Sequence, residues 1–544
     1  MSIPQDYAER VYAGVLGKII GVYVGKPFEG WTYDRIMSEL GEIRGYVHDR
    51  FSRPVVELDD DIAGTFAFLR ALADNGCTRD LSAAEIGLAW LNTLIEERTV
   101  LWWGGLGASS EHTAYLRLKS GIAAPDSGSI GTNGPVIAQQ IGAQIFIDGW
   151  AMVAPGDPEL AAELARKAAS VSHDGEAIFG AQVIAAMEAQ AFVERDVDKL
   201  LDCALGFIPK GCDVARVIGE LRELHATEPD WRKAFAWLAR EYPYARFGGG
   251  CPMVPNHALI ILALLWGAGD FAESIMIVNT CGWDTDCNSG NLGCLLGIRD
   301  GLSTFDADGV DWRGPVADRL YVPTADAGAG VTDAAIETMK IVNMGRALAG
   351  LEPVAPKGGA RFHFEFPGSV QGFEAERAAI ANVDRSLEIR SRRKGARAFT
   401  RTWARARDFG AGGYRLAASP TLYSGQTVRA GLSASSDNAT PVLCRLYVEA
   451  VGAGDAPVTC PGDDLALEPG ADGTAAWRVP DTNGAPIVRV GVEMSRPGVV
   501  RLDYLTWDGA PDVWLIPRDD VGTAWQEAWV NGVDMLSFGR KGWA

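Results

Sequence analysis

The sequence predicts a multidomain protein in which an all-α domain is followed by an all-β, jelly-roll-like sandwich domain. The chain has 544 residues, too many for one ordinary hydrophobic core. Apolar residues recur three and four positions apart before residue 350, whereas they alternate with period two after residue 360. Between the two patterns lies "LEPVAPKGG" (351–359), whose prolines and glycines indicate a linker. We therefore expect an α-helical domain over 1–350 and a β-domain over 360–544.

The first region contains several Ala- and Leu-rich segments with helical spacing, and Asp or Pro stands at the start of several of them. Almost no stretch before residue 350 alternates with period two. Typical helix and loop lengths then predict roughly a dozen helices. The clearest predicted helices cover 158–171, 179–194, 196–207, 213–225 and 230–242.

The second region contains short segments that are rich in β-branched and aromatic residues and are separated by Gly, Pro, Asn and Asp. Several such strands between turns are typical of a sandwich. Strands are predicted at 361–366, 386–390, 421–434, 441–451, 486–494 and 498–509.

The composition limits the partners and the compartment that we expect. A net charge of −20 argues against nucleic acid or an anionic membrane as the main partner. No apolar run reaches transmembrane length, and no basic segment precedes an apolar one at the start, so a cytoplasmic location is predicted. The nine cysteines include no CxxC pair, which favours free thiols.

Two clusters of carboxylates stand directly before apolar helices. Asp59, Asp60 and Asp61 precede one, and Asp284 and Asp286, in "GWDTDC", precede another. One Asp at a helix start is an ordinary cap. Several neighbouring acids raise one another's pKa values and cost stability unless a cation compensates. Because hard cations prefer carboxylate oxygens, we predict a site for Mg²⁺, Mn²⁺ or Ca²⁺ that joins the two clusters.

An EF-hand reading of "DTDCNSGNLGCL" fails. Ser289 stands where the loop needs its turn glycine, and Leu295 stands where it needs a bidentate glutamate.

Five motifs occur in an order that resembles the ADP-ribosylglycohydrolase family. "GVLGKIIGVYVGKPFEG" (14–30) matches a Gly-rich helix that ends in G-x-P-x-E. "DDDIAGTFAFLRAL" (59–72) matches a Thr-Asp-Asp-Thr motif, and "GWDTDC" (282–287) matches G-G-D-T-D-[TS]. "GGLGASSEHTAYLRLKSG" (104–121) and "SVSHDGEAIFGA" (170–181) resemble a Gly-rich segment and a Ser-x-x-His helix between them.

This resemblance, over about residues 8–350, implies an all-α fold and two divalent cations, usually Mg²⁺ or Mn²⁺. It also implies hydrolysis of ADP-ribosyl or related ribosyl bonds. The implied metal ligands are Asp60, Asp61, Asp284 and Asp286, with Glu29 beside the metals.

The sequence departs from the family pattern at four positions. Asp59 and Cys287 replace hydroxyl residues, Val22 replaces an aspartate, and Trp283 replaces a glycine. A carboxylate is a better ligand than a hydroxyl for a hard cation, and a thiol is a worse one. Because Asp59 and Cys287 stand at the positions of these hydroxyl residues, we include both in the predicted ligand set. Because the thiol is the weaker ligand, we expect one or two ions. The indole of Trp283 should narrow or reshape the pocket.

Hydrolysis of a glycosidic bond needs an acid and a base beside the anomeric carbon. Glu29 is the predicted base for a metal-polarised water. Glu111 or His112 is predicted to act on the leaving group or the ring, with surface or packing roles as the alternative. Further residues are predicted substrate contacts, each with a structural role as the alternative: Trp103, Asn133, Asp148, His173, His257 and Trp283.

The leading hypothesis is a metal-dependent glycoside hydrolase that cleaves a ribosyl or furanosyl bond of a small sugar substrate. One alternative is an ADP-ribosyl hydrolase acting on protein or a small conjugate. Another is a non-catalytic binding protein that retains the fold. The β-domain is predicted to bind carbohydrate or to buttress the active site, by analogy of fold alone.

Overall fold

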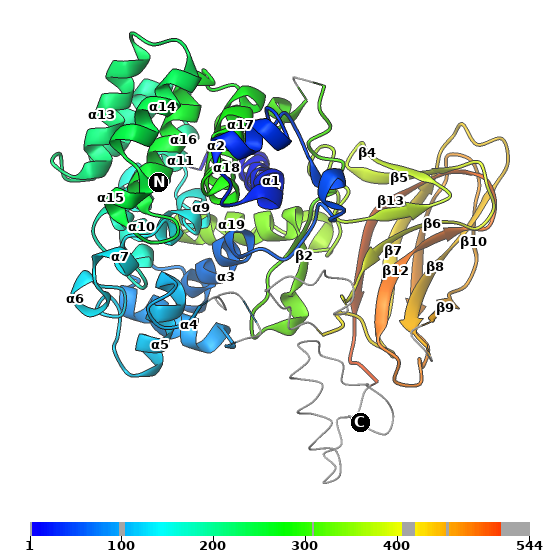
Figure 1. Cartoon of the computed structure of the whole chain (residues 1–544). Coiled ribbons are helices and arrows are strands. Elements are labelled where there is room, and N and C mark those ends of the chain that lie inside the picture. The colour runs from blue at the N-terminus through cyan, green and yellow to red at the C-terminus, as the bar shows by residue number, and fades with distance from the viewer. Residues whose placement is uncertain are drawn as a thin grey trace. The chain divides into compact units, whose positions relative to one another are not determined.

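The structure, a computed structural model, describes residues 3–96, 99, 104–306, 309–404, 419–452 and 456–512. These residues form two compact units (Figure 1). The helical unit contains residues up to Val316 together with Glu337–Pro353, and the β-unit contains Ala317–Ile336 and the described residues from Val354 onward. The predicted fold class, helices followed by a β-sandwich, is confirmed.

The helices of the described residues have the following bounds: α1 Tyr7–Gly25, α2 Tyr33–Glu39, α3 Asp60–Asp74, α4 Ala83–Thr93, α5 Ser110–Lys119, α6 Ile130–Asn133, α7 Pro135–Ala138, α8 Gly142–Ile145, α9 Asp148–Met152, α10 Pro158–Ala169, α11 Glu176–Ala191, α12 Val197–Leu205, α13 Asp213–His225, α14 Trp231–Glu241, α15 Tyr244–Phe247, α16 Met253–Trp266, α17 Phe271–Thr280, α18 Thr285–Asp300 and α19 Ala334–Leu348. Short 3₁₀ turns complete the set: η1 Lys26–Phe28, η2 His48–Phe51, η3 Leu302–Phe305, η4 Ala327–Ala329 and η5 Pro356–Gly358.

Helices α10 to α14 lie on the five segments with the clearest helical spacing. Asp157, Asp196 and Asp230 cap α10, α12 and α14 by accepting backbone N–H bonds, as their positions before the apolar runs predict. Helices α6 to α9 are four or five residues long, too short to show a periodic pattern, and no prediction covers them. No helix in the described residues is long and apolar enough to span a membrane.

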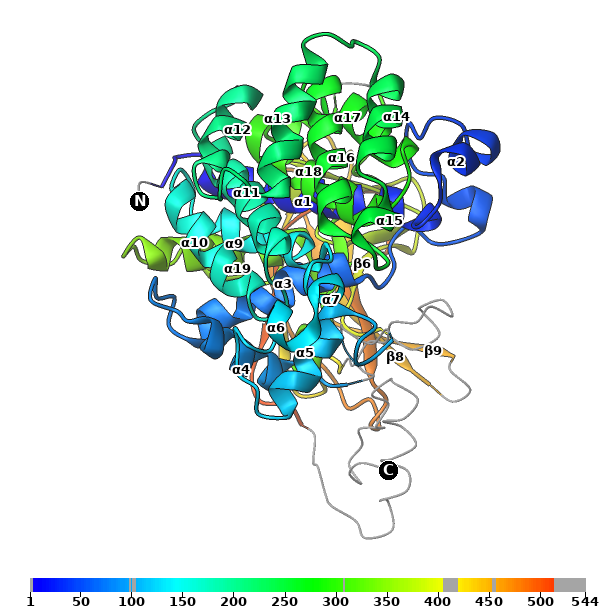
Figure 2. The same ribbon diagram turned by 60° about the vertical axis from the view of Figure 1, so that its left-hand side comes forward.

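Helices α1 and α18 lie side by side at the centre of the helical unit, where α11, α16 and α17 also pack on α18 (Figures 1 and 2). Glycines make this approach possible: a β-carbon on Gly17 would overlap the carbonyl oxygen of Gly293, and one on Gly21 would overlap that of Ser289. The hydroxyl of Ser289 donates to the carbonyl oxygen of Gly21 at 2.7 Å. This contact fixes the end of α1 against the start of α18.

The β-unit contains two antiparallel sheets, with strand orders β10-β8-β12-β6-β3 (β9 also pairs with β8) and β11-β7-β13-β5-β4, and a small β1-β2 pair. Apolar side chains from both sheets form one buried core. The strands have the following bounds: β1 Arg319–Tyr321, β2 Val331–Asp333, β3 Glu374–Glu376, β4 Ala379–Val383, β5 Ser386–Ser391, β6 Ala396–Arg401, β7 Thr427–Ala434, β8 Val442–Val451, β9 Pro457–Pro461, β10 Leu465–Leu467, β11 Asp472–Arg478, β12 Ile487–Met494 and β13 Gly498–Asp508.

The predicted strand at 361–366 is wrong, although its phenylalanines are buried in the sandwich core. Phe362 forms an isolated bridge with Leu505, and Phe364 has a left-handed φ of 53°, which interrupts an extended run. The side-chain oxygen of Gln371 accepts the N–H bonds of His363 and Phe364 at 2.7 and 2.8 Å. The side chain of Gln371 therefore accepts the backbone hydrogen bonds that a neighbouring strand would otherwise accept.

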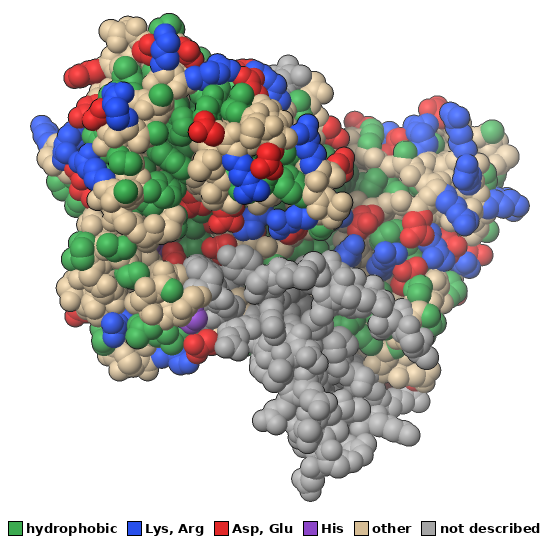
Figure 3. Space-filling view, viewed as in Figure 1, with side chains coloured by type: hydrophobic (Ala, Val, Ile, Leu, Met, Phe, Trp, Pro, Cys, Tyr) green, Lys and Arg blue, Asp and Glu red, His purple; other side chains and the backbone are tan. Residues whose placement is uncertain are grey.

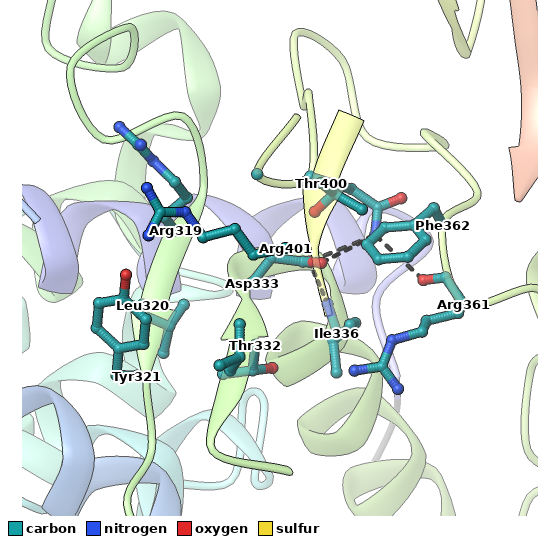
Figure 4. Close-up of a pocket in the computed structure, with 13 residues that line it drawn as sticks. Arg319, Leu320, Tyr321, Thr332, Asp333, Ile336, Arg361, Phe362, Thr400 and Arg401 are labelled. Carbon is teal, nitrogen blue, oxygen red and sulfur yellow. Dashed lines mark hydrogen bonds between the residues drawn. The ribbon is translucent and has the colours of Figure 1, made fainter. Parts of the chain in front are cut away.

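A small cavity of about 20 Å³ lies within the β-unit, large enough for about one water molecule (Figure 4). Asp333, which lines it, accepts the backbone N–H of Ile336 at 2.9 Å and an amide N–H of Gln371 at 3.3 Å. Burial, helped by the charge of Asp318, raises the pKa of Asp333 to about 7.

On the face seen in Figure 3, basic and acidic side chains are interspersed over the described surface of both units.

Candidate metal centre and cavity

Backbone contacts join the segment after α1 to the loop before α18. The N–H of Trp283 donates to the carbonyl oxygen of Trp31 at 2.9 Å, and the N–H of Gly30 donates to that of Trp283 at 2.8 Å. The hydroxyl of Thr285 donates to the carbonyl oxygen of Gly25 at 2.8 Å. "GKPFEG" and "GWDTDC", which lie more than 250 residues apart, are therefore held together.

Trp283 occupies this loop in a left-handed conformation, with φ of 69°, which a non-glycine residue adopts at a cost of roughly 1–2 kcal/mol. Its ring packs against Phe235 and Tyr244, with centroids 5.3 and 5.1 Å away. These aromatic contacts offset part of the backbone cost.

The structure brings the two predicted carboxylate clusters together. Ligand atoms of Asp61, Asp286 and Cys287 lie within 4.8 Å of one another, and so do those of Glu29, Asp284 and Asp286. Asp286 is common to both groups, so it connects α3 to the segment after α1. This convergence explains why acids stand before two separate helices in the sequence.

Two buried oxygens in the cluster fit a hard cation. Asp284 is the N-cap residue of α18, but its side chain makes no capping hydrogen bond. Its Oδ2 atom, like that of Asp61, is buried and accepts no hydrogen bond from the described residues. Buried acceptors without a donor are costly, and a bound cation removes that cost.

Burial and mutual repulsion shift the pKa values of these acids. Burial, then Asp286 and Glu29, raise the pKa of Asp284 well above its usual range. Burial, then Asp286 and the neighbouring acids, do the same for Asp61. The pKa of Asp286 rises to about 6 through burial and Glu29, while Lys26 opposes the shift. Strongly perturbed acids in one hollow are typical of a functional site.

Asp59, a predicted metal ligand, is engaged on both oxygens. Its Oδ1 atom caps α3 by accepting the N–H bonds of Asp61 and Ile62 at 2.9 and 3.4 Å. Its Oδ2 atom lies 3.0 Å from the ammonium of Lys26. The thiol of Cys287 donates to Asp61 Oδ1 at 3.3 Å, and burial raises the pKa of that thiol.

A cavity of about 740 Å³ opens over the acids, a size typical of small-molecule sites. Its acidic and aromatic lining comes from segments far apart in the sequence: Glu29, Trp31, Asp60, Asp61, Glu111, Tyr244, Trp283, Asp284 and Asp286. Polar groups also line it, from Thr32, Ser109, Ser110, Gln140, Cys251 and Cys287.

Glu111 lines this cavity in a buried position, and burial raises its pKa to about 8. Its Oε1 atom lies 3.6 Å from Nε2 of His173. Burial lowers the pKa of His173 to about 3, so the imidazole is neutral, and its Nδ1 atom contacts the Ser172 hydroxyl at 2.7 Å. Glu111 is thus a carboxylic acid that keeps its proton near neutral pH.

His173 and four other predicted residues lie outside the described lining of the cavity, and Trp103 lies outside the described residues. His112 accepts the N–H of Gly105 at 3.1 Å. Asn133 accepts from Arg117 at 3.1 Å. His257, on α16, contacts Gln144 at 2.6 Å. Asp148 pairs with the buried Lys18 at 2.8 Å. These contacts hold the fold around the cavity.

Sequence reasoning missed several residues of the site. Lys26 lies within 3.1 Å of three carboxylates, and no local sequence signal marks it, because it stands at an unspecified position of the G-x-P-x-E pattern. Trp31 lies two residues after the end of that pattern. Tyr244 lies just before the Gly-rich "RFGGGC" (246–251), which Cys251 ends, and its glycines could have been recognised as a loop at a site.

Comparison with known proteins gives one strong result. A sequence model described as ADP-ribosylglycohydrolase matches residues 3–339. No protein with a curated description matches at a significant level. A solved "ADP-ribosylglycohydrolase-related protein complex" is 16% identical, with a TM-score of 0.42, and the match covers 64% of this chain and 99% of that one.

The β-unit is similar to carbohydrate-binding modules. The "CBM22-1 xylan-binding domain from Paenibacillus barcinonensis Xyn10C" is 11% identical, with a TM-score of 0.21, over 27% of this chain and 90% of that one. A second "Xylan-Binding Domain from CBM 22" is 17% identical, with a TM-score of 0.22, and the match covers 29% of this chain and 100% of that one. Because these scores are low, the assignment rests on the sequence model, which spans more than half of the chain. The chain belongs to the ADP-ribosylglycohydrolase family, whose members are hydrolases that act on glycosyl compounds.

Proposed function

We propose that the protein is a divalent-cation-dependent hydrolase that cleaves a ribosyl or related furanosyl bond of a small molecule. The observation that carries the proposal is the cavity itself. Buried carboxylates form one part of its lining, including two oxygens, on Asp61 and Asp284, that accept no hydrogen bond from the described part of the chain, and aromatic rings form another. Carboxylates suit a hard cation, and aromatic rings stack on sugars and bases.

Asp61, Asp284 and Asp286 are the proposed principal ligands, with Asp60 and Glu29 beside them. A bound Mg²⁺, Mn²⁺ or Ca²⁺ would supply a Lewis acid that orients sugar hydroxyls and lowers the pKa of water. Glu29 is the proposed base for that water, and its position in the lining of the cavity supports this role.

Glu111 is the proposed proton donor to the leaving group. The mechanism requires a group that is protonated before bond cleavage, and the raised pKa of Glu111 provides it. His173 is then a positioning residue, since its neutral ring lies beside the Glu111 carboxyl group.

The electrostatics of the cavity favour an uncharged glycoside. Among the described residues that line it there is no arginine or lysine, and the nearby ammonium group of Lys26 is already paired with Glu29 and Asp286. A diphosphate in this setting would depend on the metal or on backbone N–H groups for compensation. Trp31 and Trp283 instead offer apolar faces.

Family membership favours a second candidate, an ADP-ribosyl hydrolase that acts on a protein or on a small conjugate. A non-catalytic binding protein is the third. The proposed role of the β-unit, binding carbohydrate or supporting the catalytic unit, applies to each of them. The cytoplasmic location stays a prediction.

The test is hydrolysis of two substrate panels by the full chain, with Mg²⁺, Mn²⁺ or EDTA. One panel contains aryl and N-linked ribofuranosides and arabinofuranosides, and the other contains ADP-ribosyl-arginine and an ADP-ribosylated protein. We expect cation-dependent cleavage in the first panel, with Asp284→Asn as the inactive control. Activity confined to the second panel would replace the leading proposal with the second candidate. Binding without turnover would indicate the third.

A further inference from the structure

Lys26 reaches into the carboxylate cluster from η1. Its Nζ atom lies 3.0 Å from Glu29 Oε2, 3.0 Å from Asp59 Oδ2 and 3.1 Å from Asp286 Oδ2. The lysine side chain is only 12% exposed, while Asp59 and Asp286 are almost completely buried. Three carboxylates from three separate segments therefore surround one ammonium group, as they would surround a metal ion.

The ammonium group and a divalent cation cannot share this position. Metal–oxygen distances of about 2.0–2.6 Å require an ion to lie among the same oxygens that Lys26 already contacts. An ion next to the ammonium group would also be repelled by its charge in a buried, weakly screened setting, so only the oxygens of the cluster that Lys26 does not contact are left for an ion. Lys26 therefore reduces the number of divalent ions that the cluster can hold.

Asp59 strengthens this argument. The motif to which "DDDIAG" is similar has a threonine at this position, so Asp59 adds one negative charge. That charge pairs with Lys26 at 3.0 Å, while the other oxygen caps α3. The two residues thus form a complementary pair inside the centre. Asp284 is not one of the three carboxylates that pair with Lys26, and its Oδ2 atom accepts no hydrogen bond from the described residues.

We propose that Lys26 is a built-in cation that replaces one of two divalent ions. The centre then takes a single ion, on the side of Asp284 and Asp286. In this arrangement Lys26 neutralises Asp59 permanently and orients Asp286 and Glu29. This inference rests on the proposed metal dependence and specifies how many divalent ions each chain binds.

The experiment measures bound Mn²⁺ by equilibrium dialysis and elemental analysis. The full-length wild type should bind one Mn²⁺ per chain. Lys26→Met keeps the length of the side chain but removes its charge, and Lys26→Met/Asp59→Thr removes both members of the pair. We expect a second Mn²⁺ in these variants, together with the spin-coupled spectrum of a neighbouring Mn²⁺ pair.

Lys119→Met is the matched control, because Lys119 pairs with Glu96 at 2.7 Å and does not contact the acids of the centre. It should bind one Mn²⁺. Two ions in the wild type would overturn the inference and leave the proposed hydrolase intact. One ion in the folded double variant would also overturn it. No bound Mn²⁺ in the wild type would overturn both this inference and the metal dependence, while the substrate panels test hydrolysis separately.

Discussion

Gly17 of α1 and Gly293 of α18 face each other so closely that a β-carbon on either would overlap the carbonyl oxygen of the other. We therefore expect Gly17→Ala to destabilise the helical unit by about 1–3 kcal/mol, because the helices must separate or distort. The shift also moves Asp284 relative to Glu29 and should weaken Mn²⁺ binding. Urea unfolding and Mn²⁺ titration check the two effects.

Gly219 provides the control for this prediction. It lies in the interior of α13, and nothing lies within 4 Å of the place that its β-carbon would occupy. Gly219→Ala should stabilise the protein by about 0.5–1 kcal/mol through helix propensity. If both variants changed stability in the same direction, close packing of α1 and α18 would not be the cause.

Asp284→Asn should have opposite effects without and with metal. Because its pKa is raised in the folded state, the folded wild type loses stability as pH increases above the ordinary pKa of an aspartate. Without metal at pH 7.5, the variant should therefore unfold at a higher temperature than the wild type. At a Mn²⁺ concentration of 100 times Kd, the wild type should gain about 2.7 kcal/mol and the variant nothing. Thermal unfolding measures both, and the exposed Asp74→Asn should respond as the wild type does.

Glu111 should set the alkaline limb of the pH–rate profile. Its pKa is about 8, and the protonated form is the proposed donor, so kcat should fall as pH increases through this value. Glu111→Gln should remove this limb and lower kcat by roughly 10²–10⁴-fold for poor leaving groups. Activated aryl glycosides should be affected much less. An equal loss for both classes of leaving group would exclude the role of proton donor.

Trp283 should determine which substrates fit. Trp283→Gly relieves the left-handed backbone but removes the ring contacts with Phe235 and Tyr244. We expect kcat/KM for small furanosides to fall at least about tenfold, since ring stacking contributes about 1–3 kcal/mol per base. Activity on ADP-ribosyl-arginine should rise as the cavity widens. Trp283→Phe, which retains an aromatic face, should keep the original preference.

Asp333 should make the stability of the β-unit depend on pH. Its pKa is about 7 in the folded state and near 3.8 when unfolded, so the folded state holds the extra proton and stability falls between pH 4 and 7. Asp333→Asn should remove this fall and be more stable at pH 8 by up to about 4 kcal/mol. Denaturant unfolding at pH 4.5 and pH 8 tests this, with the exposed Asp384→Asn as a control that keeps the slope.

The sequence predicted both architectures because each leaves a periodic pattern. Long amphipathic helices such as α13 and alternating strands such as β8 were found at nearly their observed bounds. Prediction failed where a side chain took the place of a backbone partner, as Gln371 does for the segment around Phe364. It also failed for the short helices α6 to α9, which depend on packing rather than periodicity.

The acids of the centre were predictable because several carboxylates beside apolar helices need compensation, and the structure brings Asp61, Asp284 and Asp286 together. Lys26 was not predictable in the same way. A lysine after a long apolar helix is ordinary in sequence, and only the fold shows that its ammonium group points to acids more than 30 and 250 residues away. Charge partners that are distant in sequence leave no local pattern.

The thiol of Cys287 gives the centre a mixed chemical character. Its sulfur lies within 4.8 Å of carboxylate oxygens of Asp61 and Asp286, so one group of ligand atoms combines hard and soft donors. Magnesium and manganese gain little from sulfur, whereas cadmium and zinc bind it strongly. We therefore expect cadmium or zinc to bind the proposed centre through this sulfur more strongly than magnesium or manganese, and a Cys287→Ser variant, with oxygen donors alone, to lose that preference.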